Sequence, residues 1–360
     1  MVALVAMVGA GCTGASLPPA PTGHTPTDQP SVLPSPLELP TIVLTADLSE
    51  RPTGWKLVAR IPFGSAPESL GLVTDRNRTP VPYLPASFAV DEDGSIWILD
   101  VVNKRLSHHS AGGAYLGEVT GFRFDRFSPH PMDVIAAAGR LYVLEELAPL
   151  MSKITTVEGG RISGSRFVLQ GQDHLLVTYL FPTAEGPGGY VEGFSDLDRL
   201  GTGPSGFHEL DPRTGTISPL PGIPLPGDRW GTGRFLREQH VAIGFISRSS
   251  ASDQPVTIRV VPSAGARPIK AVNNVETVLA VGAGIGMYLH IAPALRKDRH
   301  LGGGQWYLQL TADGRPLVWL RVPSGHLEDT DQHRHIAVGP DGSLYLMVPT
   351  MEEERIYLLG

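Results

Sequence analysis

The stretch FAVDEDGSIWILD, Phe88–Asp100, decides the fold. It contains an alternating apolar run, an Asp-Gly turn and a second apolar run, which is the pattern of a β-hairpin. A second copy at His335–Leu346 again places an Asp-Gly-Ser turn between two apolar runs. A hairpin repeated far along a chain indicates a repeat architecture, because each unit buries its apolar faces only by stacking against neighbours.

Similar hairpin patterns recur from about residue 54 to the end of the chain. They predict six sets of strands that begin near residues 87, 132, 166, 234, 277 and 335. The last set has three strands, and we expect Trp55–Gly64 to supply its fourth, so that both ends of the domain close a ring. An insertion at about 182–205 is a candidate functional loop. The sequence thus predicts an all-β, six-bladed β-propeller over residues 51–360.

Composition supports this fold class and excludes one class of partner. The 42 Gly and 33 Pro among 360 residues favour many turns, and the 41% of hydrophobic residues suffices for a core. The net charge is -7, and the Lys and Arg residues are scattered among acidic ones. We therefore expect no nucleic-acid partner, since that would require a basic stripe or patch. We expect a monomer.

The N-terminus indicates export. Residues 1–12 form a short apolar run that ends at Cys12, the sole cysteine, and 13–50 are rich in Pro and Thr. The ending Ala10-Gly11-Cys12 resembles the lipobox of bacterial lipoproteins, although Gly9 stands where that motif usually has Leu. The resemblance implies a signal-peptide remnant, lipidation of Cys12, a disordered linker over 13–50 and a lipid-anchored, extracytoplasmic domain at the bacterial cell surface. The alternative is an ordinary buried cysteine after a disordered start.

The hairpin at residues 93–100, together with Asn103 and Arg105, resembles an NHL repeat. This resemblance implies a six-bladed propeller of the NHL or TolB-like kind. Such propellers include binding scaffolds, lactonases, lyases and peptide-processing enzymes, so the fold alone does not select a function. We interpret Asp100, Asn103 and Arg105 as structural, because a repeated motif is first a folding unit.

Candidate ligand residues lie in loops that lead into predicted inner strands. His130 and Asp133 precede or begin the second set of strands, and His333 and His335 begin the sixth. Imidazoles and carboxylates are ligands of Zn, and these histidines resemble the metal ligands of a six-bladed lyase of peptide amidation. Glu276 and Asp133 could hold Ca or act as acid and base. The alternative is a set of solvated loops and turn partners.

Two functions follow as expectations. The first is a binding scaffold for a protein, peptide or glycan, with no certain cofactor and with membrane contact only through the lipid anchor. The second is a metal-dependent lyase or lactonase-like hydrolase with Ca or Zn in the central channel. The enzyme needs at least three ligands that converge near the axis, whereas the scaffold does not.

Overall fold

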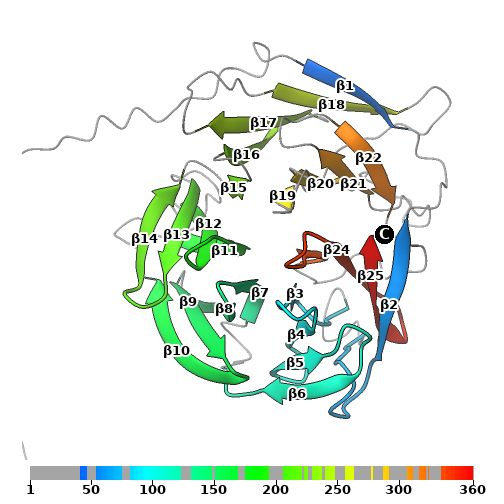
Figure 1. Ribbon diagram of the computed structural model, residues 1–360, viewed down its shortest axis with the longest axis vertical. Coiled ribbons are helices and arrows are strands. Elements are labelled where there is room, and N and C mark those ends of the chain that lie inside the picture. Colours follow the sequence, from blue (N-terminus) through cyan, green and yellow to red (C-terminus); the bar gives the residue numbers. More distant parts are fainter. Residues whose placement is uncertain are drawn as a thin grey trace, which may run out of the picture. The chain divides into compact units, whose positions relative to one another are not determined.

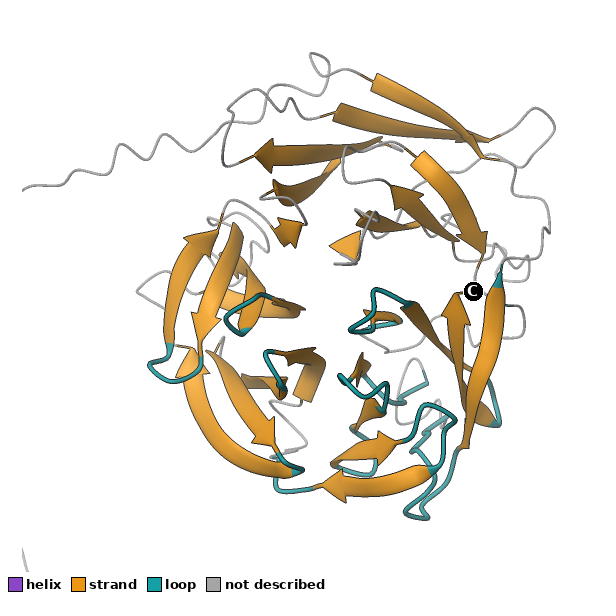
Figure 2. Ribbon diagram, in the orientation of Figure 1, coloured by secondary structure: helices purple, strands orange, loops and turns teal. Residues whose placement is uncertain are grey.

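A computed structural model describes the part of the chain on which the following account rests. The described residues are 41–46, 54–74, 82–122, 131–147, 151–168, 175–193, 206–220, 223–225, 229–236, 240–247, 256–262, 277–278, 287–291, 306–310, 316–321, 323 and 334–359. All of them belong to the compact unit Ser35–Gly360. Within these residues every regular element is a strand (Figure 2). The same residues contain no helix of the length and apolarity that crossing a membrane requires.

The strands of the described residues form six sheets arranged around a centre (Figure 1). The first two sheets consist of β3 (Ser87–Val90), β4 (Ile96–Asp100), β5 (Arg105–His109) and β6 (Tyr115–Val119), and of β7 (Pro131–Ala137), β8 (Arg140–Leu147), β9 (Met151–Glu158) and β10 (Arg161–Val168). The third consists of β11 (Leu175–Pro182), β12 (Pro187–Gly193), β13 (Gly206–Asp211) and β14 (Thr216–Leu220). The fourth consists of β15 (Ile223–Leu225), β16 (Arg229–Leu236), β17 (His240–Ser247), β18 (Val256–Pro262) and β1 (Thr41–Ala46). The fifth and sixth consist of β19 (Thr277–Val278), β20 (Met287–Ile291), β21 (Trp306–Leu310) and β22 (Pro316–Arg321), and of β23 (Ile336–Val338), β24 (Leu344–Pro349), β25 (Glu353–Leu359) and β2 (Trp55–Pro62).

The sixth sheet joins the two ends of the domain. Its outer strand β2 pairs antiparallel with β25, in a register that runs from Trp55 opposite Leu359 to Pro62 opposite Glu353. The predicted closure by the N-terminal strand is therefore confirmed. The fold is an all-β propeller, and the six sheets found among the described residues are its blades, numbered from the β3 sheet to the β2–β25 sheet.

The core lies between blades. In β8, Val143 packs with blade 1 residues, whereas the next residue, Leu144, packs with residues of blade 3. In β4, Leu99 and Ile98 likewise belong to clusters on opposite sides of blade 1. Successive side chains of a strand point to opposite faces, so each such blade is buried on both faces. This burial explains why these strands read as continuous apolar runs in the sequence.

Two strands differ from the predicted assignment. Residues 166–168, predicted to begin blade 3, lie at the end of β10, the outer strand of blade 2. The predicted insertion at 182–205 contains β12, an integral strand of blade 3. Its Gly188-Gly189 pair resembles a turn in the sequence, but the glycines are needed in the sheet: a Cβ on Gly189 would lie 2.8 Å from side-chain atoms of Val177 and Leu210. Residues 194–205 lie outside the described part.

A further strand lies in the range predicted as a linker. Within 13–50, β1 pairs in parallel with β18 and becomes the fifth strand of blade 4 (Figure 1). Its Thr41-Ile42-Val43 sequence is β-branched throughout, which favours an extended conformation over a flexible linker.

Candidate functional site

The structure describes two of the residues predicted as channel ligands, Asp133 and His335. His130, His333 and Glu276 lie outside the described residues, as does the predicted lipidation site Cys12. Among the residues that are described, no group of three or more His, Cys, Asp or Glu side chains is placed to hold a metal ion. The predicted ligand set therefore stays a prediction, apart from the environment of Asp133.

Asp133 lies on the inner strand β7 and is completely buried. Its Oδ1 accepts hydrogen bonds from the Ser87 hydroxyl at 2.7 Å, the Val134 amide at 2.9 Å and Arg334 Nε at 2.7 Å. Its Oδ2 accepts from the Leu180 amide at 2.8 Å and from Arg334 Nη2 at 2.6 Å. Both carboxylate oxygens are thus occupied by donors of this chain, in a bidentate pair with an arginine.

Arg334 reaches these partners from another blade. It lies just before β23 of blade 6, its amide donates to the Ala86 carbonyl at 3.0 Å, and its Nη2 also donates to the Leu180 carbonyl at 2.6 Å. We call the group formed by Ser87, Asp133, Leu180 and Arg334 the channel clamp. Its hydrogen bonds connect the inner parts of blades 1, 2, 3 and 6. Because the Asp133 carboxylate is committed to this clamp, it has a structural role in the described geometry.

His335 follows the clamp directly and is half-buried. Its backbone carbonyl accepts a hydrogen bond of 2.7 Å from the Met347 amide of β24. The backbone of His335 thus continues the pairing of β23 with β24 beyond the named strand.

The repeat motif forms a second buried polar group. Asp100 at the end of β4 accepts hydrogen bonds from the Gly71 amide at 3.0 Å, from the Asn103 side chain at 2.9 Å and from Arg105 Nε at 3.1 Å. Burial raises the pKa of Asp100, although these hydrogen bonds and Arg105 act in the opposite direction. Asp100, Asn103 and Arg105, the motif corner, hold one another and the segment around Gly71.

Arg105 extends the motif corner to the chain that follows β2. Its Nη1 donates to Glu118 of β6 at 2.7 Å, and its Nη2 donates to the carbonyls of Ala66 and Ser69. These contacts fasten residues 64–71 onto blade 1. The structure thus agrees with the interpretation that the motif residues fix the fold.

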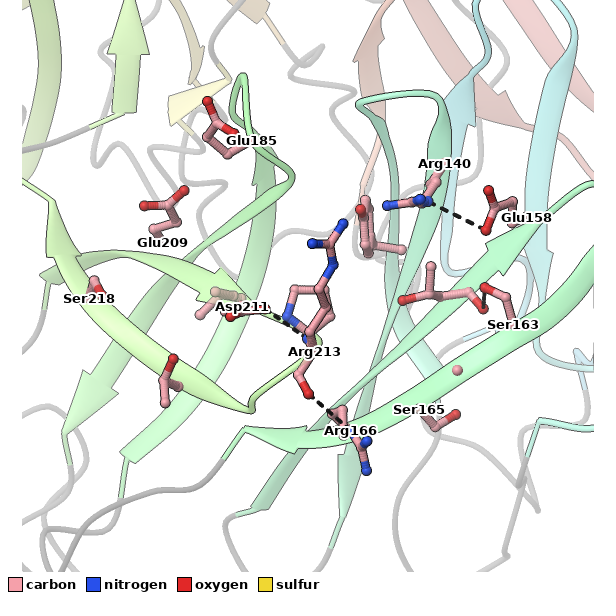
Figure 3. A pocket seen from close by; sticks show the side chains of 16 residues that line it. Arg140, Glu158, Ser163, Ser165, Arg166, Glu185, Glu209, Asp211, Arg213 and Ser218 are labelled. Carbon is pink, nitrogen blue, oxygen red and sulfur yellow. Dashed lines mark hydrogen bonds and ion pairs between the residues drawn. The ribbon is translucent and has the colours of Figure 1, made fainter.

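The described part of the chain has a large polar cleft between blades 2 and 3, with a volume of about 910 Å³ (Figure 3). Its walls come from the β7–β8 turn, the β9–β10 hairpin, the β11–β12 turn and the β13–β14 hairpin. Serine and threonine hydroxyls line it together with seven charged side chains. The charged residues of this blade 2–3 cleft are Arg140, Glu158, Arg166, Glu185, Glu209, Asp211 and Arg213.

Part of this charge is used within the cleft wall. The Asp211 carboxylate accepts the Arg213 amide and the Thr214 hydroxyl, each at 2.8 Å, and these hydrogen bonds lower the pKa of Asp211. Arg140 Nε lies 3.5 Å from Glu158 Oε2, with the two side chains 35% and 54% exposed. An ion pair this exposed contributes little, because water and salt screen it.

A smaller cavity of about 210 Å³ lies where the inner strands end. It is lined by the β3–β4, β7–β8 and β23–β24 turns and by Pro182, and it shares Arg140 with the blade 2–3 cleft. Sequence reasoning missed both cavities. Their residues come from turns that lie far apart in the chain, so a local sequence pattern does not reveal them.

Comparison with known proteins adds fold relatives. No protein-family model matches the chain, and no curated protein matches it. The solved structures similar to this chain include the PQQ-bound aldose sugar dehydrogenase from Streptomyces coelicolor, a DUF4221 member from Bacteroides vulgatus, and virginiamycin B lyase from Staphylococcus aureus. Their identities are 12%, 11% and 14%, and their TM-scores are 0.47, 0.43 and 0.40. The matches cover 84%, 85% and 77% of this chain and 97%, 97% and 94% of the other chains. These are propeller-like proteins, and such a distant likeness carries no inference about activity.

Proposed function

We propose that this protein is a non-catalytic binding propeller that holds a polar, chain-like ligand in the blade 2–3 cleft. The observation that supports this proposal is the cleft itself. Its volume of about 910 Å³ lies at the upper end of the range of ligand sites, and its walls are built from four ordered turns and hairpins. Hydroxyl and charged groups line it, so it suits a peptide or glycan better than an apolar molecule.

The commitment of Asp133 favours binding over channel chemistry. A carboxylate that already accepts five hydrogen bonds from this chain is a poor general base or metal ligand, because every donor would have to be displaced. The alternative, a metal-dependent lyase or lactonase-like hydrolase, would need other ligands, such as His130, His333 and Glu276.

Cleft-filling substitutions test the proposal. Full-length protein would be applied to peptide and glycan arrays beside a Thr216→Trp/Ser218→Trp variant, in which both exposed cleft positions carry bulky rings. Leu116→Trp is the matched control, since Leu116 is 55% exposed on the outer strand of blade 1. We expect ligands bound by the wild type and the control to be lost by the filled variant. An array with no ligand, or equal binding by the filled variant, would contradict the proposal.

We also propose that the domain is an NHL- or TolB-like propeller attached outside the bacterial cell by a lipid on Cys12. The apolar run of residues 1–11 and the lipobox-like Ala10-Gly11-Cys12 support this placement. Cys12→Ala should move the protein from the membrane fraction to the soluble fraction. Unchanged membrane association of the variant would count against lipidation.

A further inference from the structure

We infer that the ligand of the blade 2–3 cleft is a peptide segment of mixed charge, with an acidic group held between Arg140 and Arg213 and a basic group held at Glu185 and Glu209. This inference rests on the proposed function, because it names the ligand class of the same cleft.

Two arginines on opposite walls create the site for the acidic group. Figure 3 shows the side chains of Arg140 and Arg213 pointing toward one another across the cleft. Within the described residues, the Arg213 guanidinium has no hydrogen bond or ion pair to another side chain. Arg140 has a side-chain hydrogen bond with Tyr142 and the exposed contact to Glu158 at 3.5 Å, which leave further guanidinium donors for a ligand. A ligand carboxylate would accept donors from both guanidinium groups, in the planar geometry that arginine provides.

The backbone holds both arginines in place. Arg140 follows a tight turn in which Ala138 and Gly139 have φ values of 48° and 69°, the left-handed pair that closes a two-residue hairpin. Arg213 lies in the β13–β14 turn, which the Asp211 carboxylate fixes at 2.8 Å from the Arg213 amide. Fixed backbone positions reduce the ordering cost of binding to the side chains alone.

Two carboxylates on the blade 3 wall create the site for the basic group. Glu185 and Glu209 both line the cleft, and neither carboxylate bonds to another side chain within the described residues (Figure 3). Arg166 does not neutralise them, because its Nε donates to the Arg213 carbonyl at 3.3 Å and its guanidinium points away in Figure 3. The cleft thus presents two arginines that face each other from the blade 2 and blade 3 walls, and two carboxylates on the blade 3 wall.

Charge complementarity selects among ligand classes. A polyanion would meet Glu185 and Glu209, and a polycation would meet Arg140 and Arg213, so each is disfavoured by like charge. A neutral or purely acidic glycan would leave Glu185 and Glu209 without a partner. A peptide that carries both Asp or Glu and Lys or Arg provides a partner for the two arginines and for the two carboxylates.

The test is selection from a library of random octapeptides, acetylated and amidated so that their termini carry no charge. Full-length wild type should enrich peptides that contain both an acidic and a basic residue. Arg140→Gln/Arg213→Gln should lose the acidic preference and bind the best wild-type peptide roughly tenfold more weakly, while it keeps the basic preference. Glu185→Gln/Glu209→Gln should lose the preference for a basic residue and keep the preference for an acidic residue.

Arg161→Gln is the matched control, because Arg161 is an exposed arginine of β10 outside the cleft lining, and it should select as the wild type does. The inference would be overturned if the peptides selected by the wild type were not enriched in both acidic and basic residues. It would also be overturned if neither double variant changed the binding of the selected peptides. If Thr216→Trp/Ser218→Trp still abolished binding of those peptides, the proposed function would stand. If the wild type selected no peptide but bound a glycan, the inference alone would fail, and binding of neither would end both.

Discussion

The molecule contains two buried Asp–Arg groups that differ in how much of the fold they connect. In the motif corner, Asp100 and Arg105 are five residues apart and join two strands of one blade. In the channel clamp, Asp133 and Arg334 are 201 residues apart and join the inner parts of four blades. Both aspartates are completely buried and both pairs are made by the same chemical groups.

The comparison shows that a buried Asp–Arg pair can stabilise either the local structure of one blade or the contacts between several blades. The motif corner fixes a turn and the segment after β2, so its loss should loosen one corner. The channel clamp fixes how blades meet, so its loss should affect the ring as a whole. Neither aspartate is free for chemistry, which directs the search for a binding site to the cleft between blades 2 and 3.

Removing the pairing between β2 and β25, which closes the ring, should have the largest effect on stability. Deletion of residues 54–64 removes β2 and leaves β25 without its outer partner, so we expect loss of cooperative thermal unfolding. Deletion of 13–40, which contains no described strand, is the control and should leave the melting temperature unchanged. An unchanged transition after loss of 54–64 would refute closure by β2.

Breaking the motif corner should be costly but local. Asp100→Asn leaves Arg105 buried with a weakened partner, and we expect the free energy of unfolding to fall by about 3 kcal/mol in urea titrations. Hydrogen exchange should accelerate at the Gly71 amide, which donates to Asp100. Asp341→Asn, in the exposed Asp-Gly turn of blade 6, is the control with little expected effect. Faster exchange spread over all inner strands would remove the distinction between corner and clamp.

A buried histidine beside the motif corner should make stability depend on pH. Burial lowers the pKa of His109 to about 4, and its ring bonds Ser107 at 2.8 Å and the Gly113 carbonyl at 3.2 Å. The folded pKa lies below the unfolded value, so the neutral ring favours folding above about pH 6.5, and this contribution, about 3 kcal/mol, is lost as the pH falls toward 4. The free energy of unfolding, measured by urea titration at several pH values, should depend less steeply on pH between about 4 and 6.5 for His109→Gln than for the wild type. An equal pH dependence of the two proteins would contradict the assignment.

Removing an exposed ion pair between β2 and β25 should have the smallest effect on stability. Arg60 Nη1 and Glu353 Oε1 lie 3.0 Å apart across β2 and β25, but the Arg60 side chain is 59% exposed. Arg60→Gln should therefore change the free energy of unfolding by at most about 0.5 kcal/mol. A loss as large as that of Asp100→Asn would show that separation along the chain matters more than burial.

Local patterns made much of the fold predictable. The Asp-Gly turns require a left-handed glycine, and Gly94 and Gly342 have φ values of 80° and 81°. The apolar run of β4 and the need to cover the edge of β25 led to the correct blade and the correct closure. The strand β12 was not predicted because its glycines look like a turn in the sequence. They are needed because the side chains of Phe181 and Leu210 lie where a Cβ would be, and the sequence does not reveal these neighbours.

The candidate site was less predictable because it depends on distant residues. Asp133 stood out as a possible ligand, but the donor that occupies it, Arg334, is an ordinary arginine between two histidines in the sequence. The cleft arginines Arg140 and Arg213 lie at turns of different blades. They come close because blades 2 and 3 are neighbours in the ring, and no sequence motif indicates this.

A double-mutant cycle on Asp133→Asn and Arg334→Gln tests most directly that the channel clamp holds the ring together. Each single variant should lower the free energy of unfolding by about 3–5 kcal/mol, because it leaves the other charge buried without its partner. The double variant should lose less than the sum, with a coupling of about 2–3 kcal/mol. Small, strictly additive losses would contradict the clamp.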